Sequence, residues 1–151
     1  MTLGHHTTTA IVLSAMIYAA SVSASLSAAP DQSSANRTIW SGVFNAEQAK
    51  RGEASAGRNC AKCHSADLAG GQDGPALVGG DVLKAWDGMT VGELFDRVRT
   101  TMPADAPRSL SPQETADLVA FVLSLNKCPT GEKELPSEMD ALGQIRITSQ
   151  P

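Results

Sequence analysis

Two thiols and an imidazole lie together in one pentapeptide of the chain, Cys60-Ala61-Lys62-Cys63-His64. Two cysteines three positions apart near a helix end can form thioether bonds to the two vinyl groups of one porphyrin, and the next residue then places an imidazole beneath the iron. This C-x-x-C-H spacing is the attachment signature of c-type haem. The pattern therefore predicts one covalent haem c, held by Cys60 and Cys63, with His64 as an iron ligand.

Two other kinds of site use a C-x-x-C pair. A redox dithiol usually opens a helix within a βαβ unit, and the sequence has no such pattern. A structural zinc site needs a second pair of Cys or His residues to complete four ligands, and none is present. The adjacent histidine and the helix expected before Cys60 favour haem over both.

The sixth iron ligand can be narrowed by elimination. His64 is the only histidine beyond residue 28, so two histidines of the mature chain cannot both bind the iron. Thioethers remain, from Met89, Met102 or Met139. We predict Met102, because the proline that follows favours an extended segment, which can cross an open haem face. Met89, the main alternative, has core filling as its simpler role.

The third cysteine, Cys128, has no obvious partner. An odd cysteine count cannot close a complete disulfide framework. The simpler interpretation is an unpaired small residue near the surface. The other is an intermolecular disulfide.

The first 28 residues have the composition of an export signal. An apolar run over residues 10–20 is followed by small residues, with candidate cleavage after Ala24 or Ala28. The run is shorter than the roughly 20 residues of a membrane span. No Lys or Arg precedes it, which departs from the usual pattern, so an uncleaved anchor is the alternative. We expect a periplasmic protein.

The rest of the chain has room for one small all-α domain. Helix starts are indicated at Asn45, Thr90 and Ser111, each with a Gln or Glu three positions on. The expected organisation is a signal peptide over 1–28, an N-terminal extension over 29–44, a haem domain over 45–127 and a polar tail over 128–151. Leu135, Leu142, Ile145 and Ile147 are the points at which that tail could dock on its own domain or on a partner.

The chain resembles class I monohaem cytochromes c from about Trp40 to Asn126. The resemblance rests on Cys60 to His64, the Gly-Pro-x-Leu of residues 74–77, Trp86, Met102-Pro103 and the capped last helix. More narrowly, IWSGVFNAEQAKRGE, CHSADLAGG and RVRTTMPADAPRSLS are similar to periplasmic cytochromes associated with quinoprotein and related dehydrogenases.

The resemblance implies roles for further residues. The carbonyl of Pro75 would accept a hydrogen bond from His64, although a turn proline is the simpler interpretation. Trp86 would bond a haem propionate or pack in the core, and Arg97 and Arg99 could balance propionate charge or face solvent. Where relatives carry an aromatic residue in the first helix, this chain has Ala56, which predicts a looser crossing or one filled by another group.

The predicted function is one-electron transfer. His/Met ligation leaves no open iron position, and the chain beyond residue 28 has no spare histidine for the acid–base work of a small haem peroxidase. The expected partners are redox proteins (a dehydrogenase, a membrane complex or an oxidase) that bind weakly to a monomer. We expect no small-molecule substrate, and the net charge of −4 gives no reason to expect nucleic acid. The alternatives are an electron-transfer subunit of a dehydrogenase complex and a haem-based ligand sensor.

Overall fold

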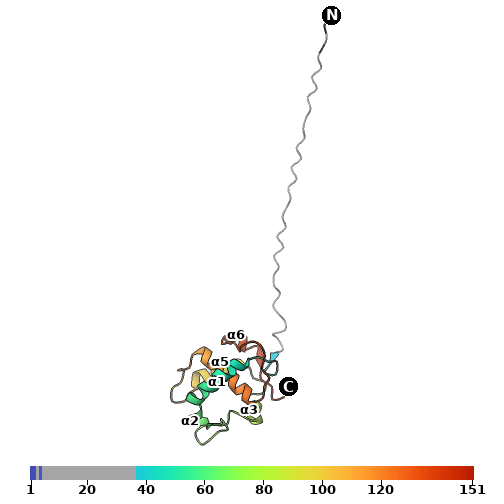
Figure 1. Cartoon of the computed structure of the whole chain (residues 1–151). Helices are drawn as coiled ribbons and strands as arrows, with labels where there is room; N and C mark the ends of the chain where they lie inside the picture. Colours follow the sequence, from blue (N-terminus) through green and yellow to red (C-terminus); the bar gives the residue numbers. More distant parts are fainter. Residues whose placement is uncertain (3, 5–36) are drawn as a thin grey trace. The chain divides into compact units, whose positions relative to one another are not determined.

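A computed structural model describes residues 1–2, 4 and 37–151 of the chain (Figure 1). Nearly all of the predicted signal peptide, both of its candidate cleavage sites and half of the predicted extension over 29–44 lie outside the described residues. None of the described helices is long and apolar enough to cross a membrane.

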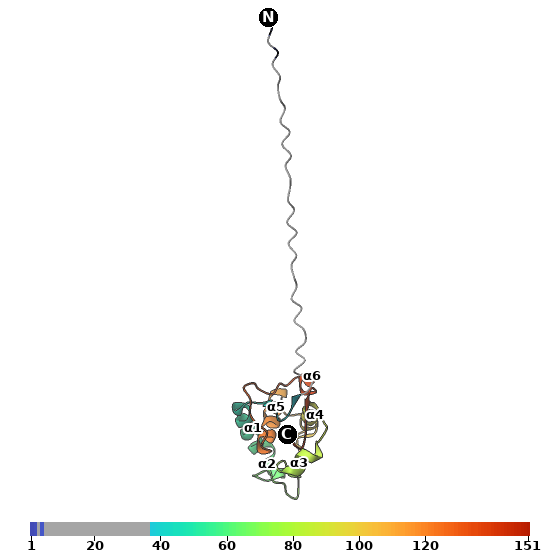
Figure 2. The same cartoon turned by 90° about the vertical axis from the view of Figure 1, so that its right-hand side faces the viewer.

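Residues 37–151 form a helical domain, so the predicted all-α fold is confirmed. One parallel pair of two-residue strands is added to it, with Arg37 opposite Ile145 and Thr38 opposite Arg146. Helices α2 and α3 lie at one end of the domain and α6 at the other in both views (Figures 1 and 2). In chain order the elements are β1 Arg37–Thr38, α1 Ala46–Asn59, α2 Ala61–His64, α3 Gly80–Ala85, α4 Val91–Thr101, α5 Pro112–Leu125, α6 Met139–Leu142 and β2 Ile145–Arg146.

The three predicted helix starts are present. Asn45 accepts a hydrogen bond from the Gln48 N–H at 2.9 Å, and Ser111 accepts one from the Glu114 N–H at 3.2 Å. Thr90 forms a complete capping box with the helix that follows. These side chains satisfy backbone donors that the first turn of a helix leaves free. The first helix departs from the prediction in one respect, because the Gln48 side chain does not reach back to Asn45.

Gln48 instead binds the tail. Its side chain is fully buried, donates to the Leu135 carbonyl at 2.9 Å and accepts from the Leu135 N–H at 2.6 Å. The tail therefore docks on its own domain. All four of the predicted docking points are at most 1% exposed (Leu135, Leu142, Ile145 and Ile147).

Cys128 belongs to the same core. It is 5% exposed and packs in the larger apolar cluster, so the expectation of a residue near the surface is wrong. The tail folds back over this position and covers it. Burial raises the pKa of the Cys128 thiol to about 11, which keeps it protonated and unreactive at neutral pH. An intermolecular disulfide would require this core to open.

Helices α1 and α5 make the closest packing in the domain. A Cβ on Gly52 would overlap the Asp117 carbonyl and lie 2.7 Å from the Phe121 Cβ, so only glycine fits at this crossing. Arg51 adds a bidentate ion pair to the Asp117 carboxylate, with both N···O distances at 2.9 Å. Gly52 therefore lies at the contact between the two helices.

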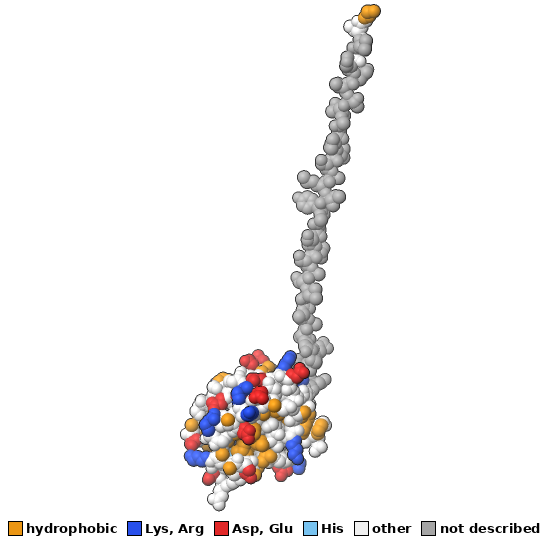
Figure 3. Space-filling model, in the orientation of Figure 1, with side chains coloured by type: hydrophobic (Ala, Val, Ile, Leu, Met, Phe, Trp, Pro, Cys, Tyr) orange, Lys and Arg blue, Asp and Glu red, His pale blue; other side chains and the backbone are white. Residues whose placement is uncertain are grey.

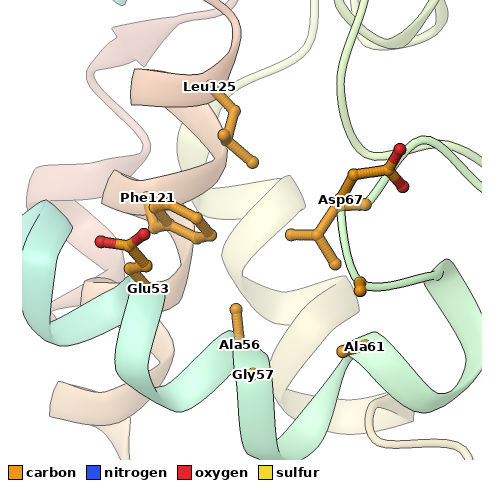
Figure 4. A pocket seen from close by; sticks show the side chains of 9 residues that line it. Glu53, Ala56, Gly57, Ala61, Asp67, Phe121 and Leu125 are labelled. Atoms are coloured by element: carbon orange, nitrogen blue, oxygen red, sulfur yellow. The ribbon is translucent and has the colours of Figure 1, made fainter.

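A hollow of about 400 Å³ opens one turn further along α1 (Figure 4). Ala56 and Gly57 lie on the α1 side and Phe121 on the α5 side. The other lining residues are Glu53, Ala61, Ala66, Asp67, Leu68 and Leu125. The absence of an aromatic side chain at Ala56 thus leaves a space that Phe121 fills only in part. Both expected alternatives are thus met in part, because Phe121 lines the space and does not close it.

Candidate functional site

His64 lies at the end of α2, in the turn that begins at Cys60. The N–H groups of Cys63 and His64 both donate to the Cys60 carbonyl, at 3.1 and 3.0 Å. This single helical turn fixes the spacing of the two thiols relative to the ring. His64 is 8% exposed, so the ring is directed into the domain.

The His64 Nδ1 atom lies 2.6 Å from the Pro75 carbonyl oxygen. A carbonyl oxygen can only accept, so Nδ1 carries the proton and donates. The lone pair is then on Nε2, the atom that a metal would bind. The contact predicted for Pro75 is present.

Gly74 leaves the space in which this ring sits. A Cβ at Gly74 would lie 2.9 Å from the His64 Nδ1 atom and 3.0 Å from the Cys63 carbonyl oxygen. Any other residue would therefore press on the ring and on the backbone of the attachment turn. Gly74 and Pro75 therefore act together. Gly74 leaves space for the His64 ring, and the Pro75 carbonyl accepts its hydrogen bond.

Asn126 fixes the loop that carries Pro75, a role that no sequence pattern indicated. Its side-chain amide donates to the Leu77 carbonyl at 2.9 Å and accepts from the Gly79 N–H at 2.9 Å. Asn126 is buried and caps the end of α5. An asparagine just past a helix end is a common capping signal. Its bonds to Leu77 and Gly79, however, cross 49 and 47 positions of sequence, and no local pattern indicates them.

Cys60 and Cys63 are both unpaired and partly exposed. Cys60 packs against an apolar cluster that contains Ala56, Leu68 and Leu110, and burial raises the pKa of its thiol. A reactive redox cysteine has a lowered pKa, so this environment does not favour a redox dithiol. In the part of the chain that the structure describes, no three or more His, Cys, Asp or Glu side chains group as a metal site.

Met102 caps the end of α4 in an extended conformation, with φ −118° and ψ 151°, as Pro103 predicted. It is half-buried. An ion pair joins its loop to the attachment turn, because Lys62 Nζ lies 3.1 Å from Asp105 Oδ2. The hydrogen bond from Lys62 lowers the pKa of Asp105. The structure thus brings the Met102 loop to the Cys60–His64 turn.

Met89 and Trp86 line an open groove of about 540 Å³ between α3 and α4, which extends to Thr101. The α4 wall of this groove is polar and includes Glu93, Asp96 and Arg97. Trp86 also packs against the larger apolar cluster, which is one of its two predicted roles. Met139, the last methionine considered, is 48% exposed at the start of α6.

The residues at this turn fit a covalently bound haem. The thiols of Cys60 and Cys63 are unpaired and lie beside the buried His64. The His64 Nδ1 atom is hydrogen-bonded to Pro75, and Gly74 leaves space for the ring. A neutral imidazole oriented by a backbone carbonyl is the usual arrangement of a metal-binding histidine.

A family model described as cytochrome C oxidase, cbb3-type, subunit III matches residues 47–122, just over half of the chain. The chain belongs to this family. It is therefore a monohaem cytochrome c with covalently bound haem c and iron, and its work is electron transfer.

Among solved structures, the chain is similar to one described as the sulfane dehydrogenase SoxCD from Paracoccus pantotrophus. The identity is 23%, the match covers 83% of this chain and 68% of that one, and the TM-score is 0.48. No curated protein matches the cytochrome.

Proposed function

We propose that this cytochrome is an exported one-electron carrier in which Cys60 and Cys63 hold the haem. His64 and Met102 would be its two axial ligands. The contact between His64 Nδ1 and the Pro75 carbonyl carries the proposal, because it leaves Nε2 free and directed for iron.

Met102 is favoured as the second ligand by its surroundings. Its loop is tied to the attachment turn by the Lys62–Asp105 pair. Val98, one helical turn earlier on α4, packs against the same smaller apolar cluster as Cys60, and also against the larger one. Met89 instead lines a groove with carboxylates, and the exposed Met139 belongs to α6, at the end of the domain away from α2 (Figures 1 and 2).

Bound haem supplies a one-electron iron couple, and the surrounding residues would determine how that couple behaves. The Pro75 carbonyl holds the imidazole ring in one orientation and makes it a better electron donor to the metal. A methionine sulfur raises the reduction potential relative to a nitrogen ligand. The apolar side chains of Leu68 and Leu110 would exclude water from the site. With His64 and Met102 both bound to the iron, no iron position would be left for a substrate.

The exported location rests on residues 1–28, whose apolar run and small residues indicate a cleaved signal. The partners would be redox proteins that dock transiently, because a carrier must bind and leave in every cycle. Mass spectrometry of the exported protein tests the location. We expect loss of the first 24 or 28 residues, and an intact N-terminus would favour a membrane anchor.

Visible absorption spectra of the exported holoprotein and its Met102→Ala variant test the ligands. We expect the unsubstituted protein to show low-spin c-type bands and the weak sulfur-to-iron charge-transfer band. Met102→Ala should keep the covalent haem but lose that band and bind carbon monoxide when reduced, because one axial position opens.

Met89→Ala is the matched control, since it removes the same thioether from the α3–α4 groove. Its spectrum should equal that of the unsubstituted protein. An unchanged spectrum in Met102→Ala, or loss of the sulfur band in Met89→Ala, would contradict the assignment. Haem that acid–acetone extraction removes would contradict covalent attachment.

A further inference from the structure

Arg99 carries a buried donor without a partner. Within residues 37–151, its Nε atom is buried and makes no hydrogen bond. A buried N–H left unpaired is unfavourable and is rare in native proteins. The donor therefore points to a group that belongs to the assembled protein but is not part of the polypeptide.

The position of Arg99 on α4 narrows what that group is. Phe95 lies four positions before it and Met102 three positions after it, so the three residues share one face of the helix. Phe95 is 2% exposed and belongs to the core, which means that this face is turned inward. The preceding residue, Val98, contacts the apolar cluster around Cys60. Arg99 therefore lies on an inward-facing side of α4, next to a residue that packs against the same small apolar cluster as Cys60.

Two other arginines, Arg51 and Arg97, differ from Arg99. Arg51 Nε donates to the Asp117 carboxylate at 2.9 Å. Arg97, two positions earlier on α4, is exposed in the open groove beside Glu93 and Asp96. Both have carboxylates beside them on the protein itself, and Arg99 Nε has none.

We propose that Arg99 binds a propionate of the haem, with its Nε–H as a donor to the propionate oxygen. This inference rests on the proposed attachment of haem at Cys60 and Cys63. A guanidinium is the side chain best suited to a carboxylate, and the propionates are the anionic groups that haem adds to the site. Arg97, two positions further from Met102 on the same helix, stays in solvent.

Nuclear magnetic resonance of the reduced, 15N-labelled holoprotein tests the contact directly. The Nε–H signals of the two arginines are assigned by their loss in Arg99→Gln and Arg97→Gln. We expect the Arg99 signal to exchange slowly with water and to show a nuclear Overhauser effect to the propionate methylene protons. The Arg97 signal should exchange rapidly and show none.

The midpoint potential gives a second readout that a purely structural role would not produce. At about pH 9, well above ordinary carboxyl pKa values, the propionates are ionised. Each variant removes one positive charge. A positive charge near the iron favours the ferrous form, so its removal should lower the midpoint potential. If Arg99 touches the propionate, its substitution should shift the potential several-fold more than Arg97→Gln does.

Either of two results would overturn the inference while the proposed function stands. One is an Arg99 signal without the propionate contact, and the other is an equal shift in the two variants, each with covalent low-spin haem. A protein that carries no covalent haem after export with haem-maturation machinery would refute the proposed function and this inference together.

Discussion

The orientation of the His64 ring depends on Gly74 and Pro75, and neither residue acts through a functional side chain. Pro75 contributes a carbonyl oxygen at 2.6 Å from Nδ1, and Gly74 contributes the absence of a Cβ. The sequence predicted the first contact, through the Gly-Pro-x-Leu resemblance. The need for glycine at position 74 is visible only in the structure. A side chain there would clash with the His64 ring, which is ten positions away in the sequence.

Gly74→Ala tests this packing at the level of one methyl group. Its Cβ would meet the His64 ring at 2.9 Å, so we expect a displaced imidazole, a changed midpoint potential and a loss of stability of about 1–3 kcal/mol. Thermal unfolding of the holoprotein and a redox titration measure both effects. Gly71→Ala is the control, because its Cβ would lie 3.7 Å from the nearest atom, the Cys63 carbonyl oxygen. Equal behaviour of the two variants would mean that Gly74 has no such role.

At the scale of elements, local signals predicted helices well. The start of α1, α4 and α5 is determined by a side chain that caps the helix within three positions, and Pro103 determines where α4 ends. The role of Gln48 could not be found in this way. It completes no capping box because its amide is engaged by Leu135, 87 positions away. No local pattern contains that information.

Two glycines of α1 offer a matched test of the helix crossing. Gly57 is exposed and its Cβ would meet nothing within 4 Å, so Gly57→Ala should stabilise the fold by about 1 kcal/mol through helix propensity alone. Gly52→Ala gains the same propensity but puts a Cβ into the Asp117 carbonyl. It should destabilise the fold by about 1–3 kcal/mol or more. Thermal unfolding should therefore move in opposite directions, and a tolerated Gly52→Ala would mean that α1 and α5 separate easily.

At the scale of the whole molecule, charge gives the domain no single-signed face in the view of Figure 3. Acidic and basic side chains are interspersed over that surface, in keeping with a formal charge of only −4 for the chain. Long-range steering of a partner by net charge is weak in such a protein. Partner choice would then depend on the groups close to the Cys60–His64 turn, such as the exposed Lys62–Asp105 pair.

The tail over residues 128–151 contributes to the core of the domain, and its deletion tests how much of the stability depends on it. Four buried apolar side chains of about 1.5–3 kcal/mol each contribute about 6–12 kcal/mol. That amount is comparable to the whole stability of a small domain, about 5–15 kcal/mol. Deletion of residues 134–151 should therefore abolish the cooperative thermal transition seen by circular dichroism. Deletion of the exposed Gln150 and Pro151 should leave it unchanged. A stable holoprotein without residues 134–151 would show that the core does not need the tail, and would favour its use as a surface for a partner.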